Sequence, residues 1–448
     1  MREVLMEAGR RAVRYLEGVN GRPVVPASQA IAGLKALDIP LPDGPTDPLA
    51  VLAELDEIGS PATMATTGGR YFGFVTGGSL PATVAAGMLA AAWDQNAVLE
   101  VCSPVASALE EVCRRWLLAA LALPEGAGVG FVSGATMANL AGLAAARHAV
   151  LGAADWDVEA AGLFGAPPIT VIVGEEVHVS LLKALSLLGL GRERVVRIPV
   201  DGQGRMRADA VPACAEPTIV CLQAGNVNTG AFDPAGAITA AAKARGAWVH
   251  VDGAFGLWAA AAPTRRHLTA GVEMADSWAT DAHKWLNVPY DSGLVFVRDP
   301  AHLRAAMSAS AAYLLEGDRR EPSHFVPEMS RRARGVEIWA ALRSLGRAGL
   351  ADLVERSCRH AARFAEGIRA AGYRVLNQVD LNQVLVSFGD DEATRRIIRR
   401  VQEDGTCWCG GTVWQGQAAM RISVSCWATT GEDVERSLGA ILRLAAAR

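Results

Sequence analysis

The sequence predicts an α/β protein in which a mostly parallel central sheet is followed by a small C-terminal α+β domain. Three observations support this prediction. From about residue 128, short apolar strands alternate with helical segments, which is typical of a parallel sheet covered by helices. The chain is also long enough for more than one small core, and half of its residues are apolar. The strands of the central sheet are expected at 128–132, 169–173, 218–223, 247–251 and 293–297.

Helices are expected before this region and between its strands. Residues 1–20 form an amphipathic pattern, followed by a Pro- and Gly-rich connector over 22–48. A single helix on such a connector cannot bury its apolar stripe alone, so we expect it to pack on a second copy of the chain. Further helices are predicted at 48–58, 82–93, 104–121, 136–151 and 234–243.

The last hundred residues alternate helix and strand on a smaller scale. A long helix is expected over 334–346, strands over 374–375, 384–388 and 420–424, and a final helix over 433–447. We therefore expect three segments. These are a helical arm used in dimerisation over 1–80, a large cofactor-binding domain over 81–345, and a small α+β domain over 346–448.

Composition excludes several classes of partner. The net charge of -4 favours neither a nucleic acid nor a membrane surface, and no apolar run is long enough to span a bilayer. The charged, amphipathic N-terminus does not resemble a secretory signal, so we expect a cytoplasmic protein. Among the eight cysteines, Cys407 and Cys409 form the one close pair, and no second pair completes a metal site.

Two residues, Asp252 and Lys284, indicate a catalytic function. Asp252 follows the apolar strand 247–251, and Lys284 lies among apolar residues in DAHKWL. A lysine in such surroundings is costly unless it is neutralised or bonded. A lysine that forms a Schiff base with pyridoxal 5'-phosphate (PLP), beside an aspartate that pairs with the protonated ring nitrogen, satisfies both residues. Taken singly, each residue has a structural role more often than a catalytic one.

A phosphate site is predicted after the strand 128–132. There Gly134, Ala135 and Thr136 open a helix, and free amides at a helix N-terminus bind anions. An ordinary N-cap has the same appearance, but the absence of GxGxxG argues against a dinucleotide. His178 is expected to stack on the cofactor ring, and His283 to reach the phosphate or the substrate carboxylate. His250, which points away from Val251 by strand alternation, is assigned a structural role.

Six stretches together carry a family resemblance: SGATMANLAGLAAAR, EEVHVSLLKAL, AGNVNTGAFDP, WVHVDGAFG, DAHKWL and SRRARGVEIWAALRSLG. In this order they resemble the group II PLP-dependent amino-acid decarboxylases, relatives of the aromatic-L-amino-acid and glutamate decarboxylases. The likeness extends from about Arg70 to the MRISVS strand. It implies the aspartate-aminotransferase-like fold (fold type I) and a homodimer with active sites at its interface.

The resemblance also implies roles for individual residues. Lys284 matches the lysine that forms the Schiff base, Asp252 the partner of the pyridinium, and Ala254 the small residue beneath the ring. His178 matches the stacking imidazole. The phosphate cup corresponds to Gly134, Ala135 and Thr136, with His283 beside it.

Two departures from the family pattern concern the turn at 225–229 and the segment 314–331. Where relatives carry a GTT-type turn, Asn228 would offer an amide in place of the usual hydroxyl near the ring oxygen. Relatives use a tyrosine of the second segment to return a proton to the carbanion, but this chain has none there. The donor is therefore open among His178, His283, Tyr313 and His324.

We expect decarboxylation of an L-amino acid to the amine and carbon dioxide, with an aromatic side chain as the expected class. Phe72 and Trp93 lie in stretches that the family places around the substrate, although both suit an apolar core equally well. Arg421 would bind a carboxylate or cap the small domain's sheet.

Three alternatives remain open. The missing tyrosine favours an enzyme that releases an aldehyde after decarboxylation or forms a carbon–carbon bond. An aminotransferase would use the same cofactor without releasing carbon dioxide. A catalytically silent dimeric scaffold would keep the fold but would show no visible absorption of the bound cofactor when PLP is supplied.

Overall fold

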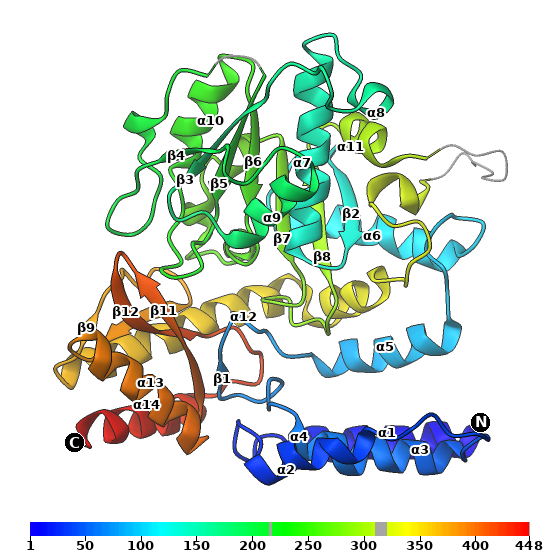
Figure 1. Cartoon of the computed structure of the whole chain (residues 1–448), viewed down its shortest axis with the longest axis vertical. Coiled ribbons are helices and arrows are strands. Elements are labelled where there is room, and N and C mark those ends of the chain that lie inside the picture. The colour runs from blue at the N-terminus through cyan, green and yellow to red at the C-terminus, as the bar shows by residue number, and fades with distance from the viewer. Residues whose placement is uncertain (215–216, 310–319, 448) are drawn as a thin grey trace. The chain divides into compact units, whose positions relative to one another are not determined.

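The computed structural model describes residues 1–214, 217–309 and 320–447, which form two compact units (Figure 1). Unit 1 comprises Met1–Gly78, Arg363–Leu376 and Val384–Arg448, and unit 2 comprises Ser79–Ala362 and Asn377–Gln383. Each unit has a sheet of its own. The division into segments 1–80, 81–345 and 346–448 stays a prediction.

Unit 2 is built on a seven-stranded sheet with the order β2-β8-β7-β6-β5-β3-β4. Strand β8 runs antiparallel to both of its neighbours, and the other pairings are parallel. The predicted α/β class with a mostly parallel sheet is therefore confirmed. The strands are β2 (Gly128–Val132), β3 (Thr170–Gly174), β4 (Val196–Ile198), β5 (Thr218–Gln223), β6 (Trp248–Asp252), β7 (Ser277–Asp281) and β8 (Gly293–Val297).

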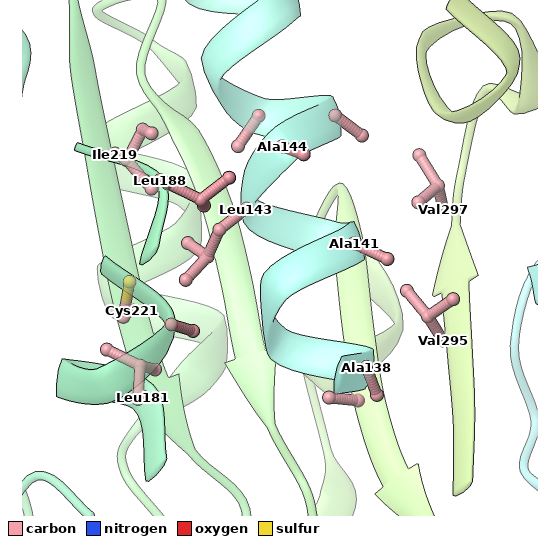
Figure 2. Packing of buried hydrophobic residues seen from close by; sticks show 14 of the residues in the cluster. Ala138, Ala141, Leu143, Ala144, Leu181, Leu188, Ile219, Cys221, Val295 and Val297 are labelled. Carbon is pink, nitrogen blue, oxygen red and sulfur yellow. The ribbon is translucent and has the colours of Figure 1, made fainter. Parts of the chain in front are cut away.

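Helix α7 (Ala135–Gly152) packs along β6, β7 and β8 and supplies much of the unit 2 core. Its buried positions are mostly alanine, including Ala138, Ala141 and Ala144, and these small side chains let the helix approach the sheet (Figure 2). Larger apolar residues such as Val295 and Val297 fill the space beside it. Burial of this apolar surface contributes about 25 cal/mol per Å².

The remaining helices of unit 2 surround this core. They are α5 (Pro81–Trp93), α6 (Pro104–Ala120), α8 (Val158–Ala161), α9 (Val179–Leu187), α10 (Ala235–Lys243), α11 (Pro300–Met307) and the first part of α12 (Gly335–Ala370). The expected end of this helix at 346 coincides with a break in helical geometry. Gly346 has φ 59° and kinks the helix, but helical geometry resumes beyond it.

Unit 1 contains a five-stranded sheet with the order β1-β11-β12-β10-β9. Strand β1 joins it in parallel with β11, so a segment from the first eighty residues completes a sheet made mostly by the C-terminus. The strands are β1 (Tyr71–Phe72), β9 (Arg374–Val375), β10 (Gln383–Ser387), β11 (Trp408–Trp414) and β12 (Gln417–Ser423). The helices are α1 (Arg2–Gly18), α2 (Ser28–Gly33), α3 (Pro48–Glu54), α4 (Ser60–Ala62), α13 (Asp391–Asp404) and α14 (Gly431–Ala446).

Helix α1 leaves its apolar stripe outside the unit 1 core. None of its residues is buried, and Leu5, Met6 and Val13 are each more than half exposed. The helix is held to the following segment through polar contacts, with Arg11 Nη1 donating to Asp56 Oδ2 at 2.7 Å. Within the described residues, no helix combines the length and the apolar character needed to cross a membrane.

Candidate active site

Asp252 ends β6 at the carboxyl edge of the unit 2 sheet and is 5% exposed. In register it lies between Gln223 of β5 and Ala279 of β7. Its Oδ2 accepts a hydrogen bond from Asn139 Nδ2 at 3.1 Å, and its Oδ1 accepts from the Ala254 amide at 3.2 Å. Two donors, one on each oxygen, therefore hold the carboxylate in one orientation.

Lys284 lies three residues beyond the end of β7, where buried Ala282, Trp285 and Leu286 surround its backbone. Its Nζ is 2.9 Å from Asp281 Oδ2, and its side chain is 18% exposed. Asp281 is itself buried. The amine is therefore held by a carboxylate while part of the lysine side chain stays accessible.

Helix α7 joins these two sites. The Ala135 amide donates to Asp281 Oδ1 at 2.5 Å, and Asn139, four residues later, donates to Asp252. Residues at i and i+4 share one helix face and are separated by about 6 Å along the axis. Three predicted parts of the site, namely the SGAT turn, Asp252 and the segment of Lys284, thus meet at the start of one helix.

The turn before α7 is also packed closely. A Cβ on Gly293 would lie 2.5 Å from the Cα of Gly134, so only glycine lets the start of β8 approach this turn. A Cβ on Gly134 would lie 3.2 Å from Cε1 of His283. His283 is therefore adjacent to the predicted phosphate cup.

The hydrogen bonds of His283 define its protonated nitrogen. Nδ1 accepts from the Ser292 amide at 3.3 Å, so in the neutral ring Nε2 carries the hydrogen and lies 3.5 Å from Asp281 Oδ1. Burial lowers the pKa of His283, and the charge of Asp281 opposes this effect only in part. The ring also lies against Tyr290, with 4.3 Å between the ring centroids.

His178 is the N-cap of α9. Its Nδ1 accepts from the Ser180 amide at 3.3 Å and lies 2.7 Å from Ser180 Oγ, which leaves the hydrogen of the neutral ring on Nε2. Gln223 Nε2 donates to the Glu176 carbonyl at 3.1 Å and ties this loop to the end of β5. Because Gln223 pairs with Asp252 in register, the His178 loop lies at the same edge of the sheet.

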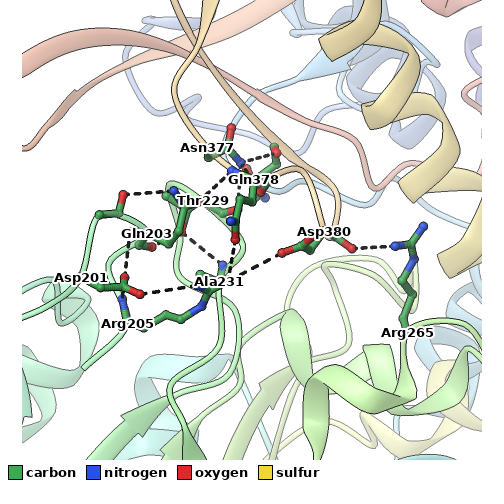
Figure 3. A network of polar contacts seen from close by, with 11 residues as sticks. Asp201, Gln203, Arg205, Thr229, Ala231, Arg265, Asn377, Gln378 and Asp380 are labelled. Atoms are coloured by element: carbon green, nitrogen blue, oxygen red, sulfur yellow. Dashed lines mark hydrogen bonds and ion pairs between the residues drawn. The ribbon is translucent and has the colours of Figure 1, made fainter. Parts of the chain in front are cut away.

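The turn that carries Asn228 follows β5 and is fixed by its own side chains. Asn226 Oδ1 accepts from the amides of Asn228 at 2.9 Å and Thr229 at 3.2 Å. Asn377 Nδ2 donates to the Thr229 carbonyl at 3.0 Å, within a polar network that continues through Gln203 (Figure 3). The turn is thereby held in place, and a role for Asn228 at the ring stays a prediction.

The proposed substrate residues are distributed over both units. Phe72 belongs to unit 1, where it is buried with its ring 5.1 Å from that of Phe364 in an edge contact. Arg421 lies on β12 of the same unit, and burial lowers its pKa. Trp93 ends α5 in unit 2 and is exposed. Their assignment to a substrate stays a prediction.

Among the possible proton donors, Tyr313 lies outside the described residues. His324 is buried in the short 3-10 helix Pro322–Phe325.

Sequence reasoning missed Asp281 and Asn139, which contact the two main residues of the site. Both stand inside motifs that were recognised, Asp281 as the first letter of DAHKWL and Asn139 in SGATMAN. A signal for Asn139 was available, since it lies one helical turn after Ala135 on the same face. Strand β7 was also missed, because Ser277, Thr280 and Asp281 make it look too polar for a fully buried strand.

The chemistry of these side chains fits PLP. The cofactor requires an amine for its aldehyde, a carboxylate for its ring nitrogen and an anion site for its phosphate. Lys284, Asp252 and the first turn of α7 supply one group of each kind.

Comparisons with known proteins agree with this chemistry. The family model for the pyridoxal-dependent decarboxylase conserved domain matches residues 35–389. Tryptophan decarboxylase 1 of Oryza sativa subsp. japonica is 28% identical over 396 residues, which are 79% of this chain and 76% of the relative. The aromatic-L-amino-acid decarboxylase of Drosophila lebanonensis is 28% identical over 394 residues, 81% of this chain and 95% of the relative.

Other relatives differ in the substrate that their names state. An acidic amino acid decarboxylase of Mus musculus is 27% identical over 330 residues, 70% of this chain and 59% of the relative. Among solved structures, the Oryza sativa tryptophan decarboxylase with PLP and tryptamine has a TM-score of 0.91 at 24% identity, covering 99% of this chain and 97% of that chain. This likeness shows the shared fold, which is fold type I.

The chain therefore belongs to the pyridoxal-dependent decarboxylase family, and it is a PLP-dependent carboxy-lyase.

Proposed function

We propose that this member of the pyridoxal-dependent decarboxylase family converts an L-amino acid with an aromatic side chain to its amine and carbon dioxide, with PLP held as a Schiff base on Lys284. The observation that supports it most is the convergence on α7. Through Ala135 and Asn139 one helix face contacts both Asp281, the partner of Lys284, and Asp252. The two contact points on α7, Ala135 and Asn139, are about one helical turn apart.

Each of these residues would have a separate task. When bound, PLP supplies an electron sink for the pair of electrons left by the departing carboxylate. Asp252 would accept a hydrogen bond from the ring nitrogen and keep that nitrogen protonated. Gly134, Ala135 and Thr136 would hold the phosphate through amides and a hydroxyl, with Ala254 beneath the ring and Asn228 near the ring oxygen.

The proton that Cα requires must come from a side chain that carries a transferable hydrogen. His178 would stack on the ring and present Nε2–H, since its Nδ1 is occupied by Ser180. His283 directs its own Nε2 toward Asp281 and would act close to the phosphate. We therefore favour His178 as the donor to Cα, and Lys284 Nζ would be the second acid in the site.

The aromatic substrate class is supported by relatives rather than by geometry. Proteins named as tryptophan and aromatic-L-amino-acid decarboxylases match most of the chain. Phe72, Trp93 and Arg421 are the residues proposed to contact the substrate. The alternative, release of an aldehyde or formation of a carbon–carbon bond, is supported by the absence of tyrosine from the sequence between 314 and 331.

A substrate panel tests this proposal. Purified protein with PLP is given single L-amino acids while carbon dioxide, amine, aldehyde and peroxide are followed together. The proposal expects equal amounts of carbon dioxide and amine from an aromatic substrate, without aldehyde. Aldehyde and peroxide in place of the amine would support the alternative, and a keto acid without carbon dioxide would indicate transamination.

The covalent attachment is tested separately at Lys284. After borohydride reduction, mass spectrometry should find the cofactor on the peptide that contains Lys284, and Lys284→Ala should lose both this adduct and decarboxylation. Lys243→Ala is the matched control, because Lys243 also pairs with a carboxylate, Asp276 Oδ1 at 2.6 Å, but is exposed. Reduced cofactor on any other lysine would contradict the assignment.

We also propose a homodimer with active sites at its interface. The exposed apolar residues Leu5, Met6 and Val13 of α1, together with Val51 and Leu55 of the following segment, offer a surface for a second copy. Light scattering should give twice the chain mass of 47.0 kDa, and Leu5→Glu with Val13→Glu should shift the measured mass toward that of the monomer.

A cytoplasmic location is likewise proposed, and cell fractionation would test it. None of the eight cysteines, all within the described residues, forms a disulfide.

A further inference from the structure

A row of buried polar side chains lies behind Asp252. Asn139 Oδ1 is 2.8 Å from His250 Nε2, His250 Nδ1 is 2.8 Å from Ser277 Oγ, and Trp248 Nε1 donates to Ser277 Oγ at 2.9 Å. The row therefore runs from Trp248 through Ser277, His250 and Asn139 to Asp252. All five side chains are buried, and Asn139, His250 and Ser277 have no exposed surface.

The direction of every hydrogen bond in this row follows from its two ends. An indole N–H can only donate, and an ionised carboxylate can only accept. Asn139 must therefore direct its NH₂ group at Asp252 and its oxygen at His250, so His250 Nε2 carries a hydrogen. The neutral imidazole then accepts at Nδ1 from the Ser277 hydroxyl, which itself accepts from Trp248.

The chemistry of His250 agrees with this direction. Burial lowers the pKa of His250 to about 3, so the ring is neutral near pH 7 and has one N–H to give. Because His250 and Asp252 are two residues apart on β6, they face the same side of the sheet, where α7 packs. Another titratable group beside the ring is the buried Cys221 thiol, which pairs with His250 in register and whose pKa burial raises.

The space for the row is also built into α7. A Cβ on Gly142, one turn beyond Asn139, would lie 2.8 Å from Cε1 of His250. Apolar side chains would fill such a core without the cost of desolvating four polar groups. The row ends on the one carboxylate that is proposed to contact the cofactor ring.

We propose that Asn139, His250 and Ser277 are positioning residues that hold the Asp252 carboxylate in the orientation required by the cofactor's ring nitrogen. This inference rests on the proposed function of Asp252. The buried row would orient the Asn139 N–H that donates to Asp252 Oδ2. The other lone pairs of the carboxylate then stay available for the ring. Trp248 closes the row, since its indole fixes which way the Ser277 hydroxyl points.

The test compares variants of the row with a matched variant outside it. Asn139→Leu and His250→Leu remove the donors, and His250→Gln restores an N–H at nearly the same place. Trp248→Phe removes the first donor of the row. Trp278→Phe is its control, because Trp278 is also a buried indole of the same sheet, and its Nε1 donates to the Val272 carbonyl at 2.8 Å, outside the row.

Two quantities are measured on each full-length variant: the dissociation constant of PLP from the cofactor-free protein, and kcat and KM for the best substrate. We expect Asn139→Leu and His250→Leu to weaken PLP binding about 10- to 100-fold, the size expected for a lost hydrogen bond to a charged group. We expect kcat to fall more than KM changes, and His250→Gln to recover most of both losses. Trp278→Phe should lower the melting temperature of the cofactor-free protein without a change in PLP affinity.

Three results would overturn the inference: unchanged PLP affinity in Asn139→Leu, equal losses in Trp248→Phe and Trp278→Phe, or no recovery in His250→Gln. Trp248→Phe and His250→Gln are mild enough to keep the test available if the leucine variants fail to fold. Failure of the proposed function has a different signature. In that case the unaltered protein would bind no PLP on Lys284 or release no carbon dioxide.

Discussion

Two consecutive glutamates on α6 offer a sharp test of the energetics of unit 2. Glu110 is fully buried, with Oε2 2.7 Å from Nη1 of Arg320 and Oε1 2.7 Å from Nη2 of Arg331. Glu111, the next residue, also bridges two arginines, but its side chain is about one-third exposed. The two positions therefore differ in burial while sharing helix, residue type and partner type.

We predict that Glu110→Gln is far more destabilising than Glu111→Gln. The amide at position 110 keeps one acceptor but places an NH₂ group against a buried guanidinium, so both arginines lose the charge of the carboxylate and one of them also loses its acceptor. Removal of one partner from a buried ion pair costs about 3–5 kcal/mol. The exposed pair at Glu111 is worth about 0–1 kcal/mol, because water already solvates both of its charges.

Urea unfolding followed by tryptophan fluorescence measures the difference. Both variants are compared with the unaltered protein at the same PLP concentration, since bound cofactor stabilises the folded state. A combined change, Glu110→Leu with Arg320→Met and Arg331→Met, should recover stability, because a well-packed apolar triad avoids desolvation. A midpoint for Glu110→Gln no lower than that for Glu111→Gln would refute the reasoning.

Three further predictions concern the site. Burial lowers the pKa of His250 from 6.5 to about 3. Between these two pH values the unfolded chain binds more protons than the folded chain. The stability contributed by the neutral ring is therefore complete above pH 6.5 and is lost as the pH falls. The loss is about 2 kcal/mol by pH 5, and His250→Gln should flatten this dependence in urea midpoints taken from pH 7 to pH 5. Asp252→Asn should lower kcat for amine formation about 10²- to 10³-fold, since it removes a preorganised charge; an unchanged kcat would contradict its role. Removing PLP should lower the melting temperature. Adding PLP back at 100 times its dissociation constant should raise the free energy of unfolding by about 2.7 kcal/mol. The Lys284→Ala variant should gain less stability from the same PLP concentration.

Local sequence alone was sufficient for the scaffold and for the cofactor. Strands 128–132, 218–223 and 293–297 were placed at their observed bounds, because each is a continuous apolar run and needs little information from the rest of the chain. Family motifs around Asp252 and Lys284 were sufficient to predict PLP and fold type I. Such motifs keep the reactive residue and its immediate neighbours together in the chain.

Tertiary structure decided which groups meet these residues. Asp281 receives the amide of Ala135, 146 residues away, and Asp252 receives the side chain of Asn139, 113 residues away. Strand β7 is buried despite its polar residues, because Ser277 and Thr280 find hydrogen-bond partners on β6 and just beyond it. Hydrogen-bond satisfaction is a property of the folded chain. A polar residue with a distant partner and one that faces water therefore look alike in sequence, and only the packing of α7 on the sheet distinguishes them.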